Sequence, residues 1–293
     1  MLDLPVSEII VFLSVVLVYL AASIIGVLQL LAGGDKYKHA LAPLVSLAVV
    51  LEAVFLILRA VELKGIPLTG LFESLVVLTV VFGLIYLMVG IVMRQVWFGS
   101  VMVWVIFSIV VLAGLTAEPA SKPHEAAKTP WAIAHGVAMI LGGACVMLAT
   151  ASAFLYLLTK RKLKQKKVLQ VLGKVPNLEK LENLNLFGLQ AAFVLITTGM
   201  LSGFGLVSTV SMLTGAGFVD WITDAKIVMI GIAWILLAVT LLVRWLCGMK
   251  GRTTAYVTIV TFVLIFFAIV GTSVFCSSMH VFSGDETKQV ENF

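Results

Sequence analysis

The segment TPWAIAHGVAMILGGACVMLATASAFLYLLTK (residues 129–160) decides the fold class of this chain. Between Trp131 and Thr159 its only titratable side chains are the imidazole of His135, the thiol of Cys145 and the phenol of Tyr156. A helix of this length is longer than the ~30 Å hydrocarbon core of a bilayer, because each residue adds ~1.5 Å. The segment therefore predicts a membrane-spanning helix with a histidine one turn inside one end.

The rest of the chain repeats this apolar pattern. Of its 293 residues 61% are hydrophobic and 12% are charged, whereas a soluble domain is roughly one-quarter charged. The mean hydropathy is +1.14. Backbone polar groups must be paired in lipid and the apolar runs lack the alternation of barrel strands, so we expect an all-α, polytopic membrane helix bundle. It forms a single integral membrane domain (1–293) with about eight spans, near residues 8–32, 40–63, 71–93, 98–117, 131–159, 186–213, 226–248 and 254–281.

A basic loop at residues 160–185, KRKLKQKKVLQVLGKVPNLEKLENLN, predicts the orientation of the bundle. The positive-inside rule places such a loop on the cytoplasmic side. With eight spans, both termini then lie outside, together with the loop 214–226 and the polar tail 283–293. The leucine spacing after Pro176 predicts a short interfacial helix that leads into the sixth span. We expect the first span to be retained, because it is too long for the apolar core of a cleavable signal.

Other features exclude several function classes. The net charge of +5 lies mainly in the basic loop, so it indicates topology rather than binding to nucleic acid. The three cysteines lie in separate spans without the spacing of a metal site, and no phosphate-binding loop or nucleophile–base pair is evident. Glycines cluster in the fifth and sixth spans, where we expect close helix packing, at Gly136, Gly142, Gly143, Gly199, Gly203 and Gly205.

Two of the four histidines share one predicted depth. His135 and His280 lie 25 and 26 residues from the predicted cytoplasmic ends of their spans, which places both ~38 Å from that boundary at the outer interface. The external loop TGAGFVDWITDAK (214–226) carries Phe218 and Trp221. Two neutral imidazoles with apolar cover form the kind of site that binds haem iron axially. The alternative is that each histidine only reaches the headgroups or bonds a neighbouring helix.

Ionisable residues within the spans are expensive and therefore candidates for function. Arg59 and Glu73 are expected at one depth across a short connection, and Glu62 lies one turn from Arg59. We weigh a structural ion pair of Arg59 against a role of Arg59 in binding a haem propionate. Glu52 lies nearer the middle of the membrane without an evident partner.

Five segments in order give the chain a family resemblance. They are GIPLTGLFESL (65–75), TPWAIAHGVAMI (129–140), VPNLEKLENLN (175–185), DWITDAKIVMIGIAW (220–234) and SMHVF (278–282). Together they resemble the cytochrome c assembly, or haem-handling, membrane proteins that include CcsA, CcmC and HemX. The resemblance covers residues 40–282 and rests on the joint order of these motifs.

The resemblance implies a set of haem-binding residues. In that family two external histidines bind haem axially, and a tryptophan-rich loop between them presents it to apocytochrome c. Matched by position, His135 and His280 become the axial pair of a non-covalent, b-type haem. The same match brings in Trp131, Trp221, Asp224 and Lys226, and Phe218 of the external loop adds apolar cover. Lys226, Lys122 and Lys128 are candidate partners of the propionates, against the alternative of solvated loop charges.

The sequence departs from the family in its loop and in its deeper histidines. Trp221 stands alone in the loop, and Ala225 replaces a proline, so the chain is closer to the HemX-like branch and its attachment activity is in question. Members of the CcsA type hold a second haem between two intramembrane histidines. Here only His39 is a candidate, at the wrong edge and without a partner, while His124 lies in an external loop. A deep haem is therefore not expected.

These observations predict a bacterial plasma-membrane protein that binds haem at its external face for presentation or transfer. It would be at most a component of a cytochrome c haem attachment system. The resemblance implies, besides lipid, a second membrane protein as partner and possible contact with apocytochrome c. The alternative is a haem-free structural or regulatory subunit, a degenerate HemX-like paralogue in a larger complex. A small-molecule transporter is a third reading, based only on Glu52 and Arg59.

Overall fold

A computed structural model describes residues 4–32, 40–68, 70–92, 96–116, 129–164, 178–214, 223–248 and 251–271. Within them the chain is all-helical, with eight helices long and apolar enough to cross a membrane. This confirms the predicted fold class and number of spans. In chain order the helices are α1 (Val6–Ala32), α2 (Leu41–Leu63), α3 (Leu71–Val92), α4 (Val96–Thr116), α5 (Pro130–Lys164), α7 (Leu178–Thr214), α9 (Ala225–Cys247) and α10 (Arg252–Phe266), the last continued by a π-helical turn at Phe267–Gly271.

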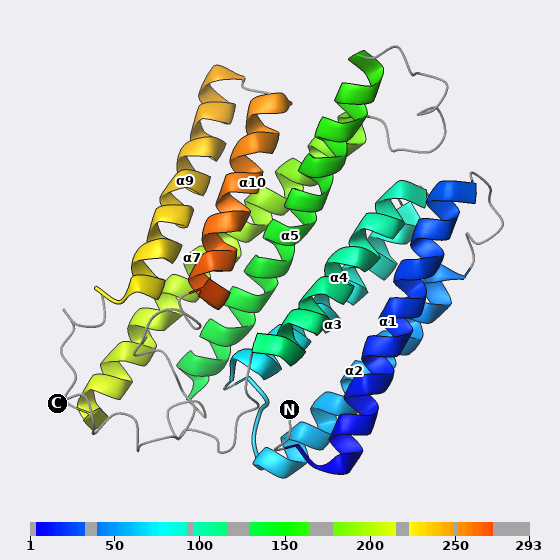
Figure 1. Ribbon diagram of the computed structural model, residues 1–293. Helices are drawn as coiled ribbons and strands as arrows, with labels where there is room; N and C mark the ends of the chain where they lie inside the picture. Colours follow the sequence, from blue (N-terminus) through cyan, green and yellow to red (C-terminus); the bar gives the residue numbers. More distant parts are fainter. Residues whose placement is uncertain are drawn as a thin grey trace.

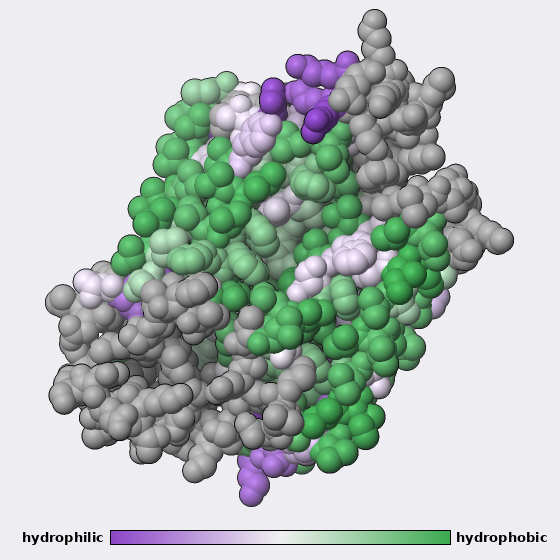
Figure 2. All heavy atoms as spheres, in the orientation of Figure 1, coloured by the Kyte–Doolittle hydropathy of each residue, from purple (hydrophilic) through white to green (hydrophobic). Residues whose placement is uncertain are grey.

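The helices form two neighbouring groups, and α5 lies where the groups meet (Figure 1). One group contains α1 to α4, and the other contains α5, α7, α9 and α10. The groups meet where α5 contacts α3 and α4. On the outer surface green, hydrophobic residues cover the middle of the bundle, and hydrophilic residues gather toward the helix ends (Figure 2). Contact with lipid requires such an apolar surface.

Helices α5 and α7 make the most extensive helix–helix contact and run antiparallel. Small residues let their backbones approach. A Cβ at Gly188 would lie 2.9 Å from the carbonyl oxygen of Cys145, and one at Gly142 would lie 2.9 Å from Ile196 Cγ1. The glycine clusters in these two spans therefore serve helix packing, as the sequence predicted.

Both ends of the predicted 160–185 loop are helical. Residues 160–164 continue α5, and α7 already begins at Leu178. The interfacial helix expected after Pro176 is therefore not a separate element but the first part of a continuous α7. Residues 165–177 lie outside the described part of the chain. Which end of the bundle faces the cytoplasm stays a prediction.

Candidate functional site

The Thr-Pro pair at the start of α5 fixes the position of His135 along the helix. Thr129 Oγ1 accepts a hydrogen bond from Ala132 N at 3.2 Å, which satisfies one of the free amides of the first turn. Pro130 occupies the first helical position, where a missing N–H costs nothing. His135 consequently lies in the second turn, on the side of α5 that faces α7.

The imidazole of His135 is anchored to the backbone of α7. His135 Nδ1 lies 2.7 Å from the carbonyl oxygen of Gly199. A carbonyl can only accept, so the hydrogen of this bond belongs to Nδ1. In the neutral ring Nε2 then carries the lone pair, which is the form that binds a metal. This contact is consistent with a histidine that only bonds a neighbouring helix. It is equally consistent with a metal ligand that binds through Nε2.

Three glycines of α7 receive three side chains from one face of α5. A Cβ at Gly199 would lie 2.6 Å from Met139 Sδ, and a Cβ at Gly203 would lie 3.2 Å from His135 Nδ1. One at Gly205 would lie 2.6 Å from Trp131 Cδ2. We call Gly199, Gly203 and Gly205 the glycine seam. It allows an imidazole and an indole to lie directly against the α7 backbone.

Trp131 lies one turn from His135 toward the start of α5. Its side chain contacts Gly205 on one side, yet the residue is 51% exposed. A large aromatic surface with one supported face and one open face suits stacking on a flat apolar ligand. Trp131 and His135 are therefore brought together at one end of the bundle.

The first turn of α9 places Lys226 within electrostatic range of His135. Asp224 is the N-cap of α9, and its Oδ1 accepts a hydrogen bond from Lys226 N at 2.8 Å. Lys226 is half-buried and close enough to His135 for an electrostatic interaction. The structure thus places Lys226 at the candidate site and gives Asp224 a structural role as a cap.

Arg59 lies in a different part of the molecule, within the group formed by α1 to α4. Its Nη2 lies 2.6 Å from Glu73 Oε1, and its Nη1 lies 3.3 Å from Glu8 Oε2. Arg59 is only 3% exposed. The structural ion pair that we weighed against propionate binding is therefore present, while Glu62 is exposed. The sequence did not predict Glu8 as a partner of Arg59, because Glu8 lies 51 positions away in another helix.

Several predicted site residues lie outside the described part of the chain. These residues are His280, Phe218, Trp221, Lys122 and Lys128, as well as His39 and His124. The pairing of His135 with His280 and the cover from the 214–226 loop stay predictions.

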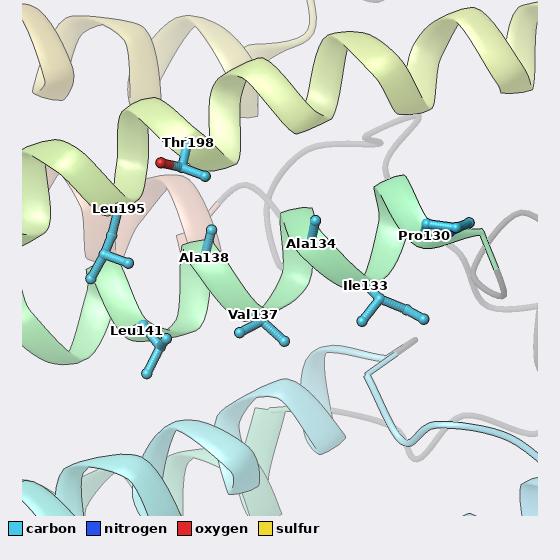
Figure 3. A pocket seen from close by; sticks show the side chains of 8 residues that line it. All are labelled: Pro130, Ile133, Ala134, Val137, Ala138, Leu141, Leu195 and Thr198. Atoms are coloured by element: carbon cyan, nitrogen blue, oxygen red, sulfur yellow. The ribbon is translucent and has the colours of Figure 1, made fainter.

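An apolar groove of about 540 Å³ lies on another face of α5. It runs along Ile133, Val137 and Leu141 and is bordered by Leu195 and Thr198 of α7, as Figure 3 shows. Neither His135 nor Lys226 lines it. None of the described residues that line the groove carries a metal-binding side chain.

Sequence comparison decides the family. A family model described as "Cytochrome C assembly protein" matches residues 68–280, which is most of the chain. This chain belongs to the cytochrome c assembly protein family. No curated protein matches it. The family match begins just before α3 and ends at His280, so it includes both candidate histidines and excludes α1 and α2. Membership in the cytochrome c assembly family suggests a haem-handling role in the biogenesis of c-type cytochromes.

Proposed function

We propose that this protein binds a non-covalent, b-type haem at its external face, with His135 and His280 as axial ligands, and holds it for presentation or transfer during cytochrome c assembly. One observation carries the proposal. The Nδ1–H of His135 donates to the carbonyl oxygen of Gly199 at 2.7 Å, and this bond fixes both the ring orientation and the tautomer. Protein ligands to metals are typically held in this way by a bond from the second ring nitrogen.

The groups around His135 fit a haem chemically. Trp131 offers an open aromatic face for the macrocycle, and Lys226 supplies a positive charge for a propionate. Within the described residues no hydrogen bond engages Nε2 of His135. The bound haem would supply the iron and its redox chemistry, while the protein supplies ligation, apolar cover and charge.

In this proposal the protein is a carrier and not the source of bond-forming chemistry. Attachment of haem to apocytochrome c needs thiols that the apocytochrome supplies, and we propose that a second membrane protein of the assembly system completes the site. We place the protein in the bacterial plasma membrane, in keeping with the family. Trp221 and Phe218 of the predicted external loop would add apolar cover for the haem.

A haem-free subunit is the competing function, and one observation favours it. His135 and Trp131 already fill the glycine seam, so they contribute to the α5–α7 contact even without a ligand. In that case both side chains serve only helix packing.

Titration of the purified full-length protein in nanodiscs with haemin separates the two functions. We expect a sharp Soret band at one haem per chain, which is lost in the His135→Ala, His280→Ala double variant. His39→Ala and His124→Ala are matched controls that should keep the band. An unchanged band in the double variant, or no saturable band in the wild type, contradicts the proposal and favours the haem-free subunit.

A further inference from the structure

A second polar cluster lies inside α1, α2 and α3, away from His135. Glu52 of α2 is 1% exposed, and Tyr19 of α1 and Thr79 of α3 are fully buried. Tyr19 Oη lies 3.1 Å from Glu52 Oε2, and Thr79 Oγ1 lies 2.7 Å from Glu52 Oε1. We propose that these three residues form a proton-binding site in the membrane interior, in which the carboxyl group of Glu52 carries the proton.

The number of hydrogens available favours the protonated form of Glu52. Thr79 Oγ1 also lies 2.7 Å from the carbonyl oxygen of Val76, and a hydroxyl has a single hydrogen to donate. With an ionised Glu52, Thr79 can bond either the carboxylate or the carbonyl, and the other close oxygen pair has no hydrogen between its atoms. An oxygen pair of this kind is repulsive in a buried site.

One added proton satisfies all three contacts. Glu52 Oε1–H donates to Thr79 Oγ1, and Thr79 Oγ1–H donates to the Val76 carbonyl. Tyr19 Oη–H donates to Glu52 Oε2, which is then the carbonyl oxygen of a neutral acid. Each short contact has one hydrogen, and no charge is left in the apolar interior. Loss of the proton to water reverses these steps and leaves one negative charge on Glu52.

A layer of aromatic rings separates this site from the nearest charged groups. Phe12, Phe55 and Phe72 lie within 5.3–5.8 Å of one another, centroid to centroid, and come from α1, α2 and α3. Phe55 lies between Glu52 and Arg59 in the sequence of α2, and all three residues are buried on that helix. The aromatic layer therefore keeps the Arg59 guanidinium away from Glu52.

The charged groups of the surrounding helices confirm the isolation of Glu52. In α1 the titratable groups are Tyr19 and Glu8, and Glu8 is paired with Arg59. In α3, Glu73 is also paired with Arg59, and the remaining titratable residue is Tyr86. The sequence of α4 contains no titratable residue. No described cation faces Glu52, so its ionised form would be buried without a counter-charge.

The proton-binding site is independent of the proposed haem function. Tyr19 and Glu52 belong to α1 and α2, which precede the part of the chain that matches the family, and only Thr79 lies within it. A failure of either proposal leaves the other standing.

Infrared difference spectroscopy of the full-length protein in nanodiscs tests the site. At neutral pH the wild type minus Glu52→Gln spectrum should show the C=O stretch of a protonated carboxylic acid, which shifts in D₂O. The band should change frequency in Thr79→Val, which removes one hydrogen-bond partner, and stay in place in Glu62→Gln, whose side chain is exposed. Carboxylate bands in place of the acid band would overturn the proposal.

A stability comparison provides a second readout that does not depend on the infrared assignment. Glutamine has the shape of a neutral glutamic acid, and its amide can donate to Thr79 and accept from Tyr19. We expect the unfolding midpoint of Glu52→Gln to match that of the wild type, and Glu52→Leu to lower it, because the two hydroxyls lose a partner. A Glu52→Gln variant as unstable as Glu52→Leu would show that Glu52 acts as a carboxylate.

Discussion

His135 of α5 and Gly199 of α7 are joined by a 2.7 Å hydrogen bond between an imidazole nitrogen and a backbone carbonyl oxygen. The two residues are 64 positions apart, and the bond forms only because α5 and α7 run antiparallel in close contact. The glycine seam makes this approach possible. Helix packing and the orientation of the candidate ligand therefore depend on the same interface.

Gly205→Ala should disturb Trp131. The added Cβ would lie 2.6 Å from Trp131 Cδ2, closer than side chains approach one another, so the indole must move. We expect a lower unfolding midpoint and haem binding weakened several-fold, measured by thermal unfolding and haemin titration. Gly231→Ala is the matched control, because nothing lies within 4 Å of a Cβ built there. Equal behaviour of the two variants would contradict the role assigned to the seam.

Arg59→Met should strongly destabilise the packing of α1, α2 and α3. It leaves the carboxylates of Glu8 and Glu73 buried without their cation, and breaking a buried ion pair in this way costs ~3–5 kcal/mol. Reversible unfolding in mixed micelles measures the loss. Haem affinity of the remaining folded protein should be unchanged. A folded Arg59→Lys variant with much weaker haem binding would instead support the propionate role of Arg59.

Asp224→Ala should remove the N-cap of α9. The carboxylate accepts from Lys226 N at 2.8 Å, and losing such a cap costs ~1 kcal/mol. Asp224→Ser retains an acceptor and should restore most of the stability, as measured by the unfolding midpoint. If the serine variant is as unstable as the alanine variant, Asp224 acts through its charge and not as a cap.

Lys226→Ala should weaken haem binding because it removes the amino group that interacts electrostatically with His135 and that we propose binds a propionate. We expect Lys226→Arg to retain most of the haem affinity. Lys226→Ala should bind haem several-fold more weakly, and its binding should depend less on the salt concentration. A haem analogue with esterified propionates separates the causes. It should bind the wild type and Lys226→Ala equally, and a difference that persists with the ester would exclude a propionate contact.

Much of the architecture could be predicted from the sequence. All eight spans follow from apolar length, because this signal is local. The glycines of α5 and α7 were correctly assigned to packing. Their side-chain partners were not predictable, since the register of two antiparallel helices depends on the whole interface.

The buried polar contacts were the harder part. The Arg59–Glu73 pair was predicted because a short connection joins their helices, whereas Glu8 reaches Arg59 from the start of α1. Glu52 had no evident partner in the sequence, and its partners Tyr19 and Thr79 come from two other helices. Tyrosine and threonine are also common in spans without any polar role, so their residue types carried no signal.

The most direct measurement is the electron paramagnetic resonance spectrum of the ferric haem-loaded protein. We expect a low-spin signal typical of two imidazole ligands in the wild type. Each single variant, His135→Ala and His280→Ala, should convert it to a high-spin signal, which added imidazole returns to low spin. A low-spin bis-imidazole spectrum that survives in either variant would show that this histidine is not a ligand, and would contradict haem binding between His135 and His280.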